Sequence, residues 1–365
     1  MSKLKKMIIL EMILVAMLAV GIGVRSSVGR EKELDDGTVN TSTLSAEKGF
    51  IKWVDFNVSY EALCAAYDWA VKTHDTEHPV GFVELLSYTA AKTGGEFESK
   101  ALKILKKAAG ELAEGETTME ALTENMKYYT YYREAYGAVL DGLVGEFEEE
   151  YINEDGEGAF RKVYGLKAFF PLAKGFDYTH YDDFGVGRSY GYQRKHLGHD
   201  MMGQTGTPII SIESGYVEAM GWNQYGGWRI GIRSLDGKRY YYYAHLRQNY
   251  PFAEGLKEGD LVTAGDVIGY MGHTGYSTKE NVNNIEVTHL HWGLQLIFDE
   301  SQKECDNEIW IDVYALTRFL AKHSQETQKV ENTREWVRTL RIIDPQMQAW
   351  EEEYRKKSKG NMNKS

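Results

Sequence analysis

Two short clusters of histidine occur in a chain that contains only ten histidines. The first reads HLGHD at residues 196–200, and the second reads HLH at residues 289–291. Imidazole nitrogens and carboxylate oxygens are common ligands of a catalytic zinc ion, which takes three such ligands and keeps a fourth position for water. The two clusters together contain more candidate ligands than such a site needs. They therefore point to metal-assisted chemistry.

The alternation of side chains along a β-strand decides which of these groups can meet, because successive side chains point to opposite faces. His289 and His291 would share one face. His196 and Asp200 are four residues apart and can project together, while His199 points away. A single histidine in a strand is more often hydrogen-bonded or exposed than a ligand. The two patterns together predict a β-sheet metal site, since the helical HExxH signature does not occur in the sequence.

The strands that carry these clusters are expected within residues 165–320. From Gly165 the chain becomes rich in glycine, tyrosine and β-branched residues, in short runs such as WRIGIRS and RYYYYAHL. The LDG sequence between these two runs predicts a hairpin turn. In the second run Tyr241, Tyr243 and His245 would share one face and are expected to line a groove. We therefore predict a mostly antiparallel β-sheet domain.

Helical segments are expected on both sides of this domain. Residues 50–150 carry apolar residues at three- and four-residue spacing, with glycines as stops, and predict a small helical domain of unassigned role. The charged tail at 321–365 is predicted to be helical, with Asp344-Pro345 at a helix start. The fold class expected for the whole chain is therefore α+β.

The first 24 residues predict a membrane anchor or signal segment. Three lysines precede an apolar run at residues 7–24, which a single glutamate interrupts. Eighteen helical residues span about 27 Å, which is marginal for the hydrocarbon core of a bilayer. We expect a single-pass anchor followed by a linker at 25–49, with most of the chain on the extracytoplasmic side because positive residues stay inside. If the segment is cleaved, the protein is secreted.

Composition narrows the classes of partner. The chain has 365 residues, of which 42% are hydrophobic and 26% charged, and its formal net charge is −12. This acidic balance argues against a nucleic-acid partner, which would be bound by clustered lysine and arginine. Only two cysteines occur, Cys64 and Cys305, so no disulfide framework is expected and free thiols are favoured.

Three motifs resemble those of the lysostaphin-type, LytM-like zinc endopeptidases, which cut peptide cross-links of bacterial peptidoglycan. They are HLGHD at 196–200, YAHL at 243–246 and HLH at 289–291, in that order and separation. The connecting sequence GTPIISIESGYVEAMG resembles the family's strand pair after the aspartate. The resemblance covers about residues 167–300, so the helical segment and the tail lie outside it.

The resemblance implies a role for five residues. It makes His196, Asp200 and His291 the ligands of one zinc ion per chain. It makes His245 and His289 catalytic histidines that do not bind the metal. In such a site the ion polarises the scissile carbonyl and activates water, while a nearby imidazole accepts the proton of the water or stabilises the oxyanion.

Some residues depart from the family pattern. His199 occupies a position that is usually aliphatic, Thr288 stands where proline is common, and KENVNNIEV lengthens the approach to the last motif. None of these changes removes a ligand. His199 and His273 are expected to be packing or loop residues, because a catalytic zinc site must keep one position open.

Two classes of function fit this sequence. The first is a membrane-tethered, extracytoplasmic zinc endopeptidase that hydrolyses cross-links or stem peptides of peptidoglycan. The second is a non-catalytic wall-binding or assembly scaffold with the same fold. Degenerate members of the family lose a ligand or a catalytic histidine, whereas all five positions are filled here, which favours the enzyme. The bond that is cut, the cellular process and the oligomeric state stay open.

Overall fold

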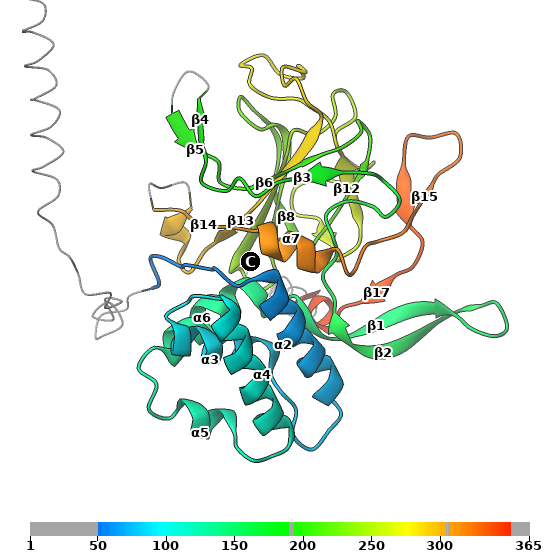
Figure 1. Cartoon of the computed structure of the whole chain (residues 1–365). Coiled ribbons are helices and arrows are strands. Elements are labelled where there is room, and N and C mark those ends of the chain that lie inside the picture. Colours follow the sequence, from blue (N-terminus) through cyan, green and yellow to red (C-terminus); the bar gives the residue numbers. More distant parts are fainter. Residues whose placement is uncertain (1–49, 190–192, 304, 306, 352–365) are drawn as a thin grey trace, which may run out of the picture. The chain divides into compact units, whose positions relative to one another are not determined.

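The computed structural model describes residues 50–189, 193–303, 305 and 307–351 (Figure 1). The predicted anchor at 1–24 and linker at 25–49 lie outside these ranges. Within the described ranges, no helix has both the length and the apolar character needed to cross a bilayer.

The predicted helical segment forms five helices between residues 60 and 140. Their bounds are α2 Tyr60–Thr73, α3 Phe82–Thr93, α4 Ser99–Ala113, α5 Met119–Thr123 and α6 Tyr129–Leu140. The side chain of Ser59 accepts a hydrogen bond from the amide of Ala62 and so caps α2. Gly94 ends α3 with a left-handed backbone, φ 70°, as glycine at this position commonly does.

The chain leaves the helical arrangement before residue 150. Strands β1 (Val144–Ile152) and β2 (Gly158–Leu166) form an antiparallel hairpin where the sequence had indicated helix up to 150. The first strand reads VGEFEEEYI, and its glutamates occupy both faces of a hairpin that is mostly solvent-accessible. The alternation of apolar and polar residues that would indicate a strand is therefore weak in this sequence, which is why the hairpin was not predicted.

The main sheet contains eight strands among the described residues. Its order is β11-β8-β9-β10-β13-β6-β3, and β14 also pairs with β13. The strands are β3 Thr179–His180, β6 His199–Met202, β8 Gly215–Asn223, β9 Gly227–Ser234, β10 Arg239–Ala244, β11 Leu261–Val262, β13 His289–Leu296 and β14 Ile309–Ile311. Every pairing in it is antiparallel, as the sequence predicted. The predicted turn joins β9 to β10, with Gly237 at φ 74°.

Strand β13 shows how this sheet separates a core face from an open face. Leu290, Trp292 and Leu294 alternate with His289 and His291, and the first three are fully buried. The apolar face packs into a hydrophobic core that continues into the helical segment. Burial of that face fixes the strand register, since a shift by one residue would exchange the two faces. The histidines are thereby held on the open face.

Shorter strands surround the main sheet. They are β4 Gly187–Ser189, β5 Gln193–Lys195, β7 Pro208–Ile210, β12 Val267–Tyr270, β15 Thr327–Lys329, β16 Trp336–Arg338 and β17 Ile342–Ile343. The pairs are β4 with β5, β7 with β12, and β15 with β16, while β17 joins the edge of β1. The helix α7, Tyr314–Leu320, lies between the main sheet and the helical segment (Figure 1).

The prediction of a helical tail from residue 321 was wrong for most of the described part. The chain there forms β15, β16 and β17, and a helix begins only at Pro345. Asp344 does stand at that helix start, where its carboxylate accepts a hydrogen bond from the amide of Gln346. The same carboxylate forms a buried ion pair with Lys167, 3.0 Å apart. Pairing with β1 and this ion pair attach the tail to the rest of the structure, which charge and periodicity alone do not reveal.

The helical segment and the main sheet also meet through a buried ion pair. Arg239 of β10 donates to both carboxylate oxygens of Glu213, at 2.7 and 3.1 Å. A third nitrogen of the same guanidinium donates to the carbonyl of Ala138 in α6, at 2.8 Å. Tyr241 also donates to Glu213 at 2.8 Å. The arginine thus connects the end of α6 to the sheet.

We expect Arg239→Met to lower the free energy of unfolding by about 3–5 kcal/mol, because it leaves Glu213 buried without a cation. Chemical denaturation followed by circular dichroism measures the change. The control is Arg161→Met, because Arg161 forms an exposed ion pair with Glu149 whose loss costs at most about 1 kcal/mol. Equal effects of the two substitutions would contradict the stabilising role of the buried pair.

Candidate metal centre

Three predicted ligands converge at one end of the open face. His196 precedes β6, Asp200 lies in β6, and His291 lies directly opposite Asp200 in β13. One carboxylate oxygen of Asp200 lies 3.0 Å from Nε2 of His196 and 2.8 Å from Nδ1 of His291. The two histidine nitrogens are 3.1 Å apart. Two imidazole nitrogens and a carboxylate oxygen therefore face one another across a space that suits a single cation.

The backbone carbonyl of Asp183 orients the His196 ring. It forms a hydrogen bond with Nδ1 of His196 at 3.2 Å, and a carboxylate oxygen of the same residue lies 3.1 Å from that nitrogen. A hydrogen on Nδ1 leaves the lone pair of Nε2 directed at the ligand atoms of Asp200 and His291. A hydrogen bond from the outer ring nitrogen is the usual support of a metal-binding histidine. Arg188 contacts Asp183 and lies 3.3 Å from the second oxygen of Asp200. The site is thus held by an outer layer of charged residues.

The charges in the cluster favour a cation. Burial by itself would raise the pKa of Asp200, but hydrogen bonds from His196 and His291 hold it well below its ordinary value. Burial disfavours a charge on His196, whereas its hydrogen bond to Asp200 raises its pKa. Burial lowers the pKa of His291. An ionised carboxylate therefore lies beside two nitrogens that can offer lone pairs.

Two further histidines stand next to the cluster. The ring of His245 lies 4.7 Å from that of His289 and 5.9 Å from that of His291, measured between centroids. Nδ1 of His245 lies 2.9 Å from the carbonyl of Thr274, and Nδ1 of His289 lies 2.8 Å from the carbonyl of Val287. A hydrogen on each Nδ1 leaves Nε2 of both rings as an acceptor.

The electrostatic environment keeps His245 neutral. Burial, together with the neighbouring rings of His289 and His291, holds its pKa well below the ordinary value. A neutral imidazole with a free Nε2 can accept a proton. Nε2 of His289 lies 3.8 Å from Asp200, so this ring stands at the border of the ligand cluster.

The expected arrangement of the tyrosines was wrong. Strand β10 ends at Ala244, and His245 has a left-handed backbone, φ 63°, so the alternation of the strand stops before the histidine. Tyr241 and Tyr243 are fully buried in the core instead of lining a groove. Their neighbour Tyr242 faces the site, with its ring 6.0 Å from that of His291.

A groove extends from the cluster along the open face of the sheet. Its volume is about 640 Å³, and His196 and His291 form part of its wall. Tyr240 and Tyr242 of β10 and Trp310 of β14 also line it. A groove that ends at a cluster of potential metal ligands can hold an extended chain with one bond next to the metal.

Comparison with known proteins supports this assignment. Residues 194–304 match Peptidase family M23. This stretch of the β-rich part is therefore similar to an M23 peptidase domain. The match begins two residues before His196 and includes Asp200, His245, His289 and His291, so all five predicted site residues fall within it.

Two curated proteins contain segments similar to this M23 domain. An L-Ala--D-Glu endopeptidase of Bacillus subtilis (strain 168) is 41% identical over 125 residues, which are 34% of this chain and 37% of that protein. Lysostaphin of Staphylococcus simulans is 39% identical over 89 residues, which are 24% of this chain and 17% of lysostaphin. The chain therefore spans only 37% and 17% of the length of these two relatives.

Solved structures are also similar to part of this chain. The catalytic domain of the antimicrobial peptidase lysostaphin from Staphylococcus simulans is 30% identical, with 39% of this chain and 92% of that chain covered and a TM-score of 0.30.

The two remaining histidines of the M23 domain motifs take structural positions. His199 points away from the ligands, as predicted, and its Nε2 lies 2.8 Å from Nδ1 of His180. Burial and the neighbouring His180 lower the pKa of His199 to about 3. His273 lies in a loop, where its Nδ1 is 2.7 Å from the carbonyl of Ile285.

Sequence reasoning missed the contributions of Asp183 and Gly198 to the M23 site. Asp183 lies in the DDFGVGR sequence, where an acid close to an arginine is a weak signal of an outer layer around a metal. Gly198 is the central residue of HLGHD. A Cβ atom there would lie 2.5 Å from Cε1 and Nε2 of His291 and 2.8 Å from the carbonyl oxygen of Trp292. The glycine therefore leaves space for the ligand ring.

We expect Gly198→Ala to weaken zinc binding by about 10–100-fold, the usual effect of disturbing the groups that hold a metal ligand in place. The added methyl group must push the His291 ring, because the backbone of Trp292 cannot yield as easily. Competition with a fluorescent zinc chelator measures the affinity. The matched control is Gly187→Ala, because no atom lies within 4 Å of a Cβ at that position. Unchanged zinc affinity of the Gly198 variant would contradict this account of the motif.

Proposed function

We propose that this protein is a zinc endopeptidase that hydrolyses peptides of bacterial peptidoglycan. The convergence of His196, Asp200 and His291 at the end of a groove carries the proposal. The match of residues 194–304 to Peptidase family M23 and the names of the similar enzymes support the substrate class.

The donor set suits zinc. Two histidine nitrogens and one carboxylate oxygen are a frequent ligand set of catalytic zinc, which needs three protein ligands. His196 already has its second nitrogen directed at Asp183, so its ligand nitrogen is free to bind. Zinc held by these residues supplies a Lewis acid that polarises the scissile carbonyl and lowers the pKa of the attacking water.

The two other histidines provide the proton chemistry in this proposal. His245 is neutral and offers Nε2, and it can therefore take the proton of the attacking water. His289 holds its own ring by the bond to the Val287 carbonyl and presents Nε2 on the same side. When Nε2 also carries a proton, the ring can donate a hydrogen bond to the oxygen on which negative charge develops.

A non-catalytic scaffold is the alternative. The five site residues are all present, and the outer contacts of Asp183, Thr274 and Val287 hold three of their rings in orientations that a scaffold does not need. These contacts favour the enzyme.

We further propose that residues 1–24 anchor the protein in the cell membrane, with the M23 domain outside. The apolar run after three lysines supports this placement. Protease added to intact cells without their wall should then digest the chain beyond residue 25. Protection of the whole chain would refute the placement, and a mature protein that begins near Val24 in the medium would show cleavage instead of anchoring.

The central test joins metal analysis to digestion of peptidoglycan. Purified full-length protein should contain one zinc per chain, release new amino termini from peptidoglycan and lose this activity to a chelator. Identification of the new termini establishes which bond is cut. A folded preparation that contains zinc but releases no termini from any peptidoglycan would refute the enzyme and favour the scaffold.

A further inference from the structure

We propose that the groove beside the metal centre binds a free carboxylate of the substrate peptide, with Arg229 as its principal partner. This inference rests on the proposed peptidase function and specifies the substrate class as an acidic peptide. Neutral glycine bridges would lack the group that the groove recognises.

The floor of the groove is made of strands that carry glycine beside aromatic rings. Tyr242 pairs with Gly231 of β9 on one side and Gly293 of β13 on the other. A Cβ at Gly231 would lie 1.9 Å from the Tyr240 hydroxyl, and one at Gly293 would lie 2.8 Å from the Trp310 ring. The absence of side chains at these two positions lets the rings lie over the sheet. Glycine within central strands often allows such a close approach, and here it lets these rings form the floor of the groove.

Two arginines face this space with donors to spare. Arg194 and Arg229 both line the groove, and both have an Nε that is buried and without a hydrogen-bond partner in the part of the chain that is described. Burial raises the pKa of Tyr242, and the charges of these two arginines oppose the rise, so both lie near its hydroxyl. A guanidinium binds a carboxylate through two parallel hydrogen bonds, and because each Nε is buried, the terminal Nη groups are the donors that a ligand would meet.

The two arginines differ in the contacts that they already make within the protein. Arg194 donates to the Tyr276 hydroxyl and stacks on the Tyr276 ring, 5.3 Å from its centroid. Arg229 contacts the Tyr240 hydroxyl. Within the described ranges, neither arginine forms an ion pair with a carboxylate. Arg229 is therefore the better candidate for a ligand, and Arg194 adds positive charge next to it.

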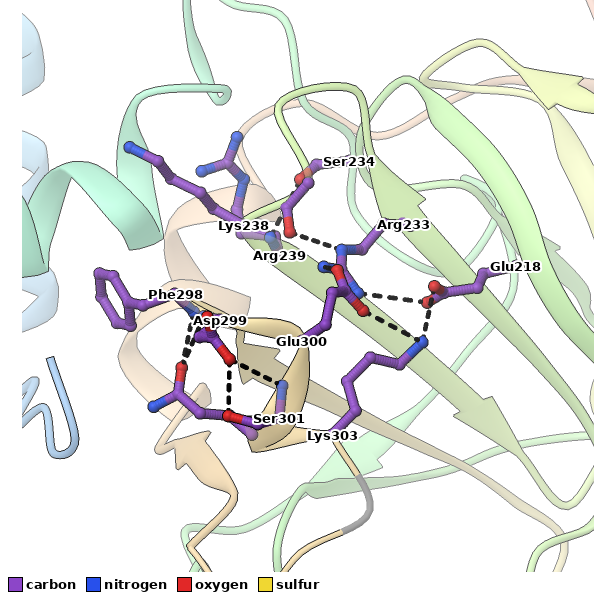
Figure 2. A network of polar contacts seen from close by, with 12 residues as sticks. Glu218, Arg233, Ser234, Lys238, Arg239, Phe298, Asp299, Glu300, Ser301 and Lys303 are labelled. Carbon is purple, nitrogen blue, oxygen red and sulfur yellow. Dashed lines mark hydrogen bonds and ion pairs between the residues drawn. The ribbon is translucent and has the colours of Figure 1, made fainter. Parts of the chain in front are cut away.

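The carboxylates at the groove already form ion pairs or hydrogen bonds with other groups of the protein. Glu218 lies 2.7 Å from Nζ of Lys303 and 3.5 Å from Arg233, and Figure 2 shows it between these two cations. Glu300 completes this network through its contact with Arg233, at 2.5 Å. Glu308 accepts a hydrogen bond from the indole of Trp310, at 2.7 Å. The carboxylates on the groove wall thus do not neutralise Arg229.

The charge of the groove contrasts with that of the whole chain. Among the described residues, Arg194, Lys195, Arg229 and Lys303 line it together with two acids, Glu218 and Glu308, whereas the formal net charge of the protein is −12. The cations attract anions to the groove, whereas the acidic surface of the rest of the protein repels them. The groove ends at the candidate metal centre. We therefore infer that the bound anion belongs to the same substrate peptide as the bond that lies next to the metal.

The test uses two peptides that differ in one group. One is L-alanyl-γ-D-glutamyl-L-lysyl-D-alanine with a free glutamate α-carboxylate, and the other carries a carboxamide there. Titration calorimetry measures their binding to zinc-loaded full-length protein carrying His245→Ala, in which turnover is expected to be slow. We expect the carboxylate peptide to bind about tenfold more tightly, as suits a charge-assisted pair of hydrogen bonds. Combining Arg229→Gln with this background should reduce the preference to less than about threefold.

Three controls separate the possible outcomes. Arg229→Lys keeps the charge but loses the planar fork, and it should give an intermediate preference. Arg161→Gln removes an exposed arginine from the β1–β2 hairpin and should leave the preference unchanged. Zinc content and circular dichroism confirm that each variant is folded. Equal binding of the two peptides, or a full preference in folded Arg229→Gln, would overturn the inference.

The proposed function is tested separately on the same peptides. Cleavage is measured with the unsubstituted protein by chromatography of the products. Selective binding without cleavage of either peptide or of peptidoglycan would refute the peptidase and leave the carboxylate site standing. Cleavage of both peptides with equal kcat/KM would support the peptidase and refute the carboxylate site.

Discussion

Full-length protein carrying Asp200→Ala is expected to purify without stoichiometric zinc and to have no measurable activity on peptidoglycan. Asp200 is the only one of the three converging residues whose side chain is an anion, and one of its oxygens lies within about 3.0 Å of both histidine nitrogens. Loss of a ligand should exceed the about 10–100-fold weakening that loss of an outer contact causes. Metal analysis after gel filtration and the release of new amino termini measure the two effects.

The control for this substitution is Asp155→Ala. Asp155 lies at the exposed turn of the β1–β2 hairpin and is not near the ligand cluster. This variant should contain one zinc per chain and retain the parental activity. A fully zinc-loaded and active Asp200 variant would show that the cluster is not the metal site.

The second large effect is expected for His245→Ala, which should keep its zinc but reduce turnover by about 10²–10⁴-fold, the range for a positioned acid–base or oxyanion group. His245 lies next to the cluster and forms a hydrogen bond with the Thr274 carbonyl, so its removal takes no ligand away. Alanine also carries a Cβ, so the left-handed backbone at this position costs a similar amount in both forms.

The two histidines of the HLH motif should differ in their effect on zinc binding. His289→Ala should behave like His245→Ala, with zinc retained, whereas His291→Ala should lose the metal. His78→Ala, at an exposed position in the helical segment, serves as the neutral control. If His289→Ala loses zinc and His291→Ala retains it, the roles within the motif are reversed. Parental turnover in all the site variants would mean that the residues have no catalytic role.

Regular strand geometry explains why the ligand cluster could be predicted from the sequence. His289 and His291 lie in β13, whose alternate residues are fully buried, so a period of two places both histidines on the open face. The convergence with His196 and Asp200 depends on β6 pairing with β13. The spacing within each motif was informative, but the pairing itself was supplied by the resemblance to a known family.

The errors occurred where the backbone leaves regular geometry. The alternation was extended from Tyr241 to His245, although the strand ends at Ala244 and the chain turns with a positive φ. No local sequence pattern shows that the strand ends at Ala244 and does not continue to His245. Asp183 was missed for a different reason, because its contact with His196 joins two loops that only the folded chain brings together. The strands of the tail likewise depend on partners far away in the sequence.

The core shared by the helices and the sheet limits how this protein can be recombined with other modules. Tyr67 of α2 packs edge-on against Phe319 of α7, with centroids 5.5 Å apart, and Arg239 is bonded to the end of α6. A fragment restricted to the family match at 194–304 would lack both of these rings, expose the apolar sheet residues that share a core with the helices, and leave the arginine without one of its acceptors. For a chimaeric enzyme directed to a different cell wall, the transferable cassette therefore starts near residue 50 and ends after the segment that pairs with β1, so that new targeting modules are best joined outside these limits.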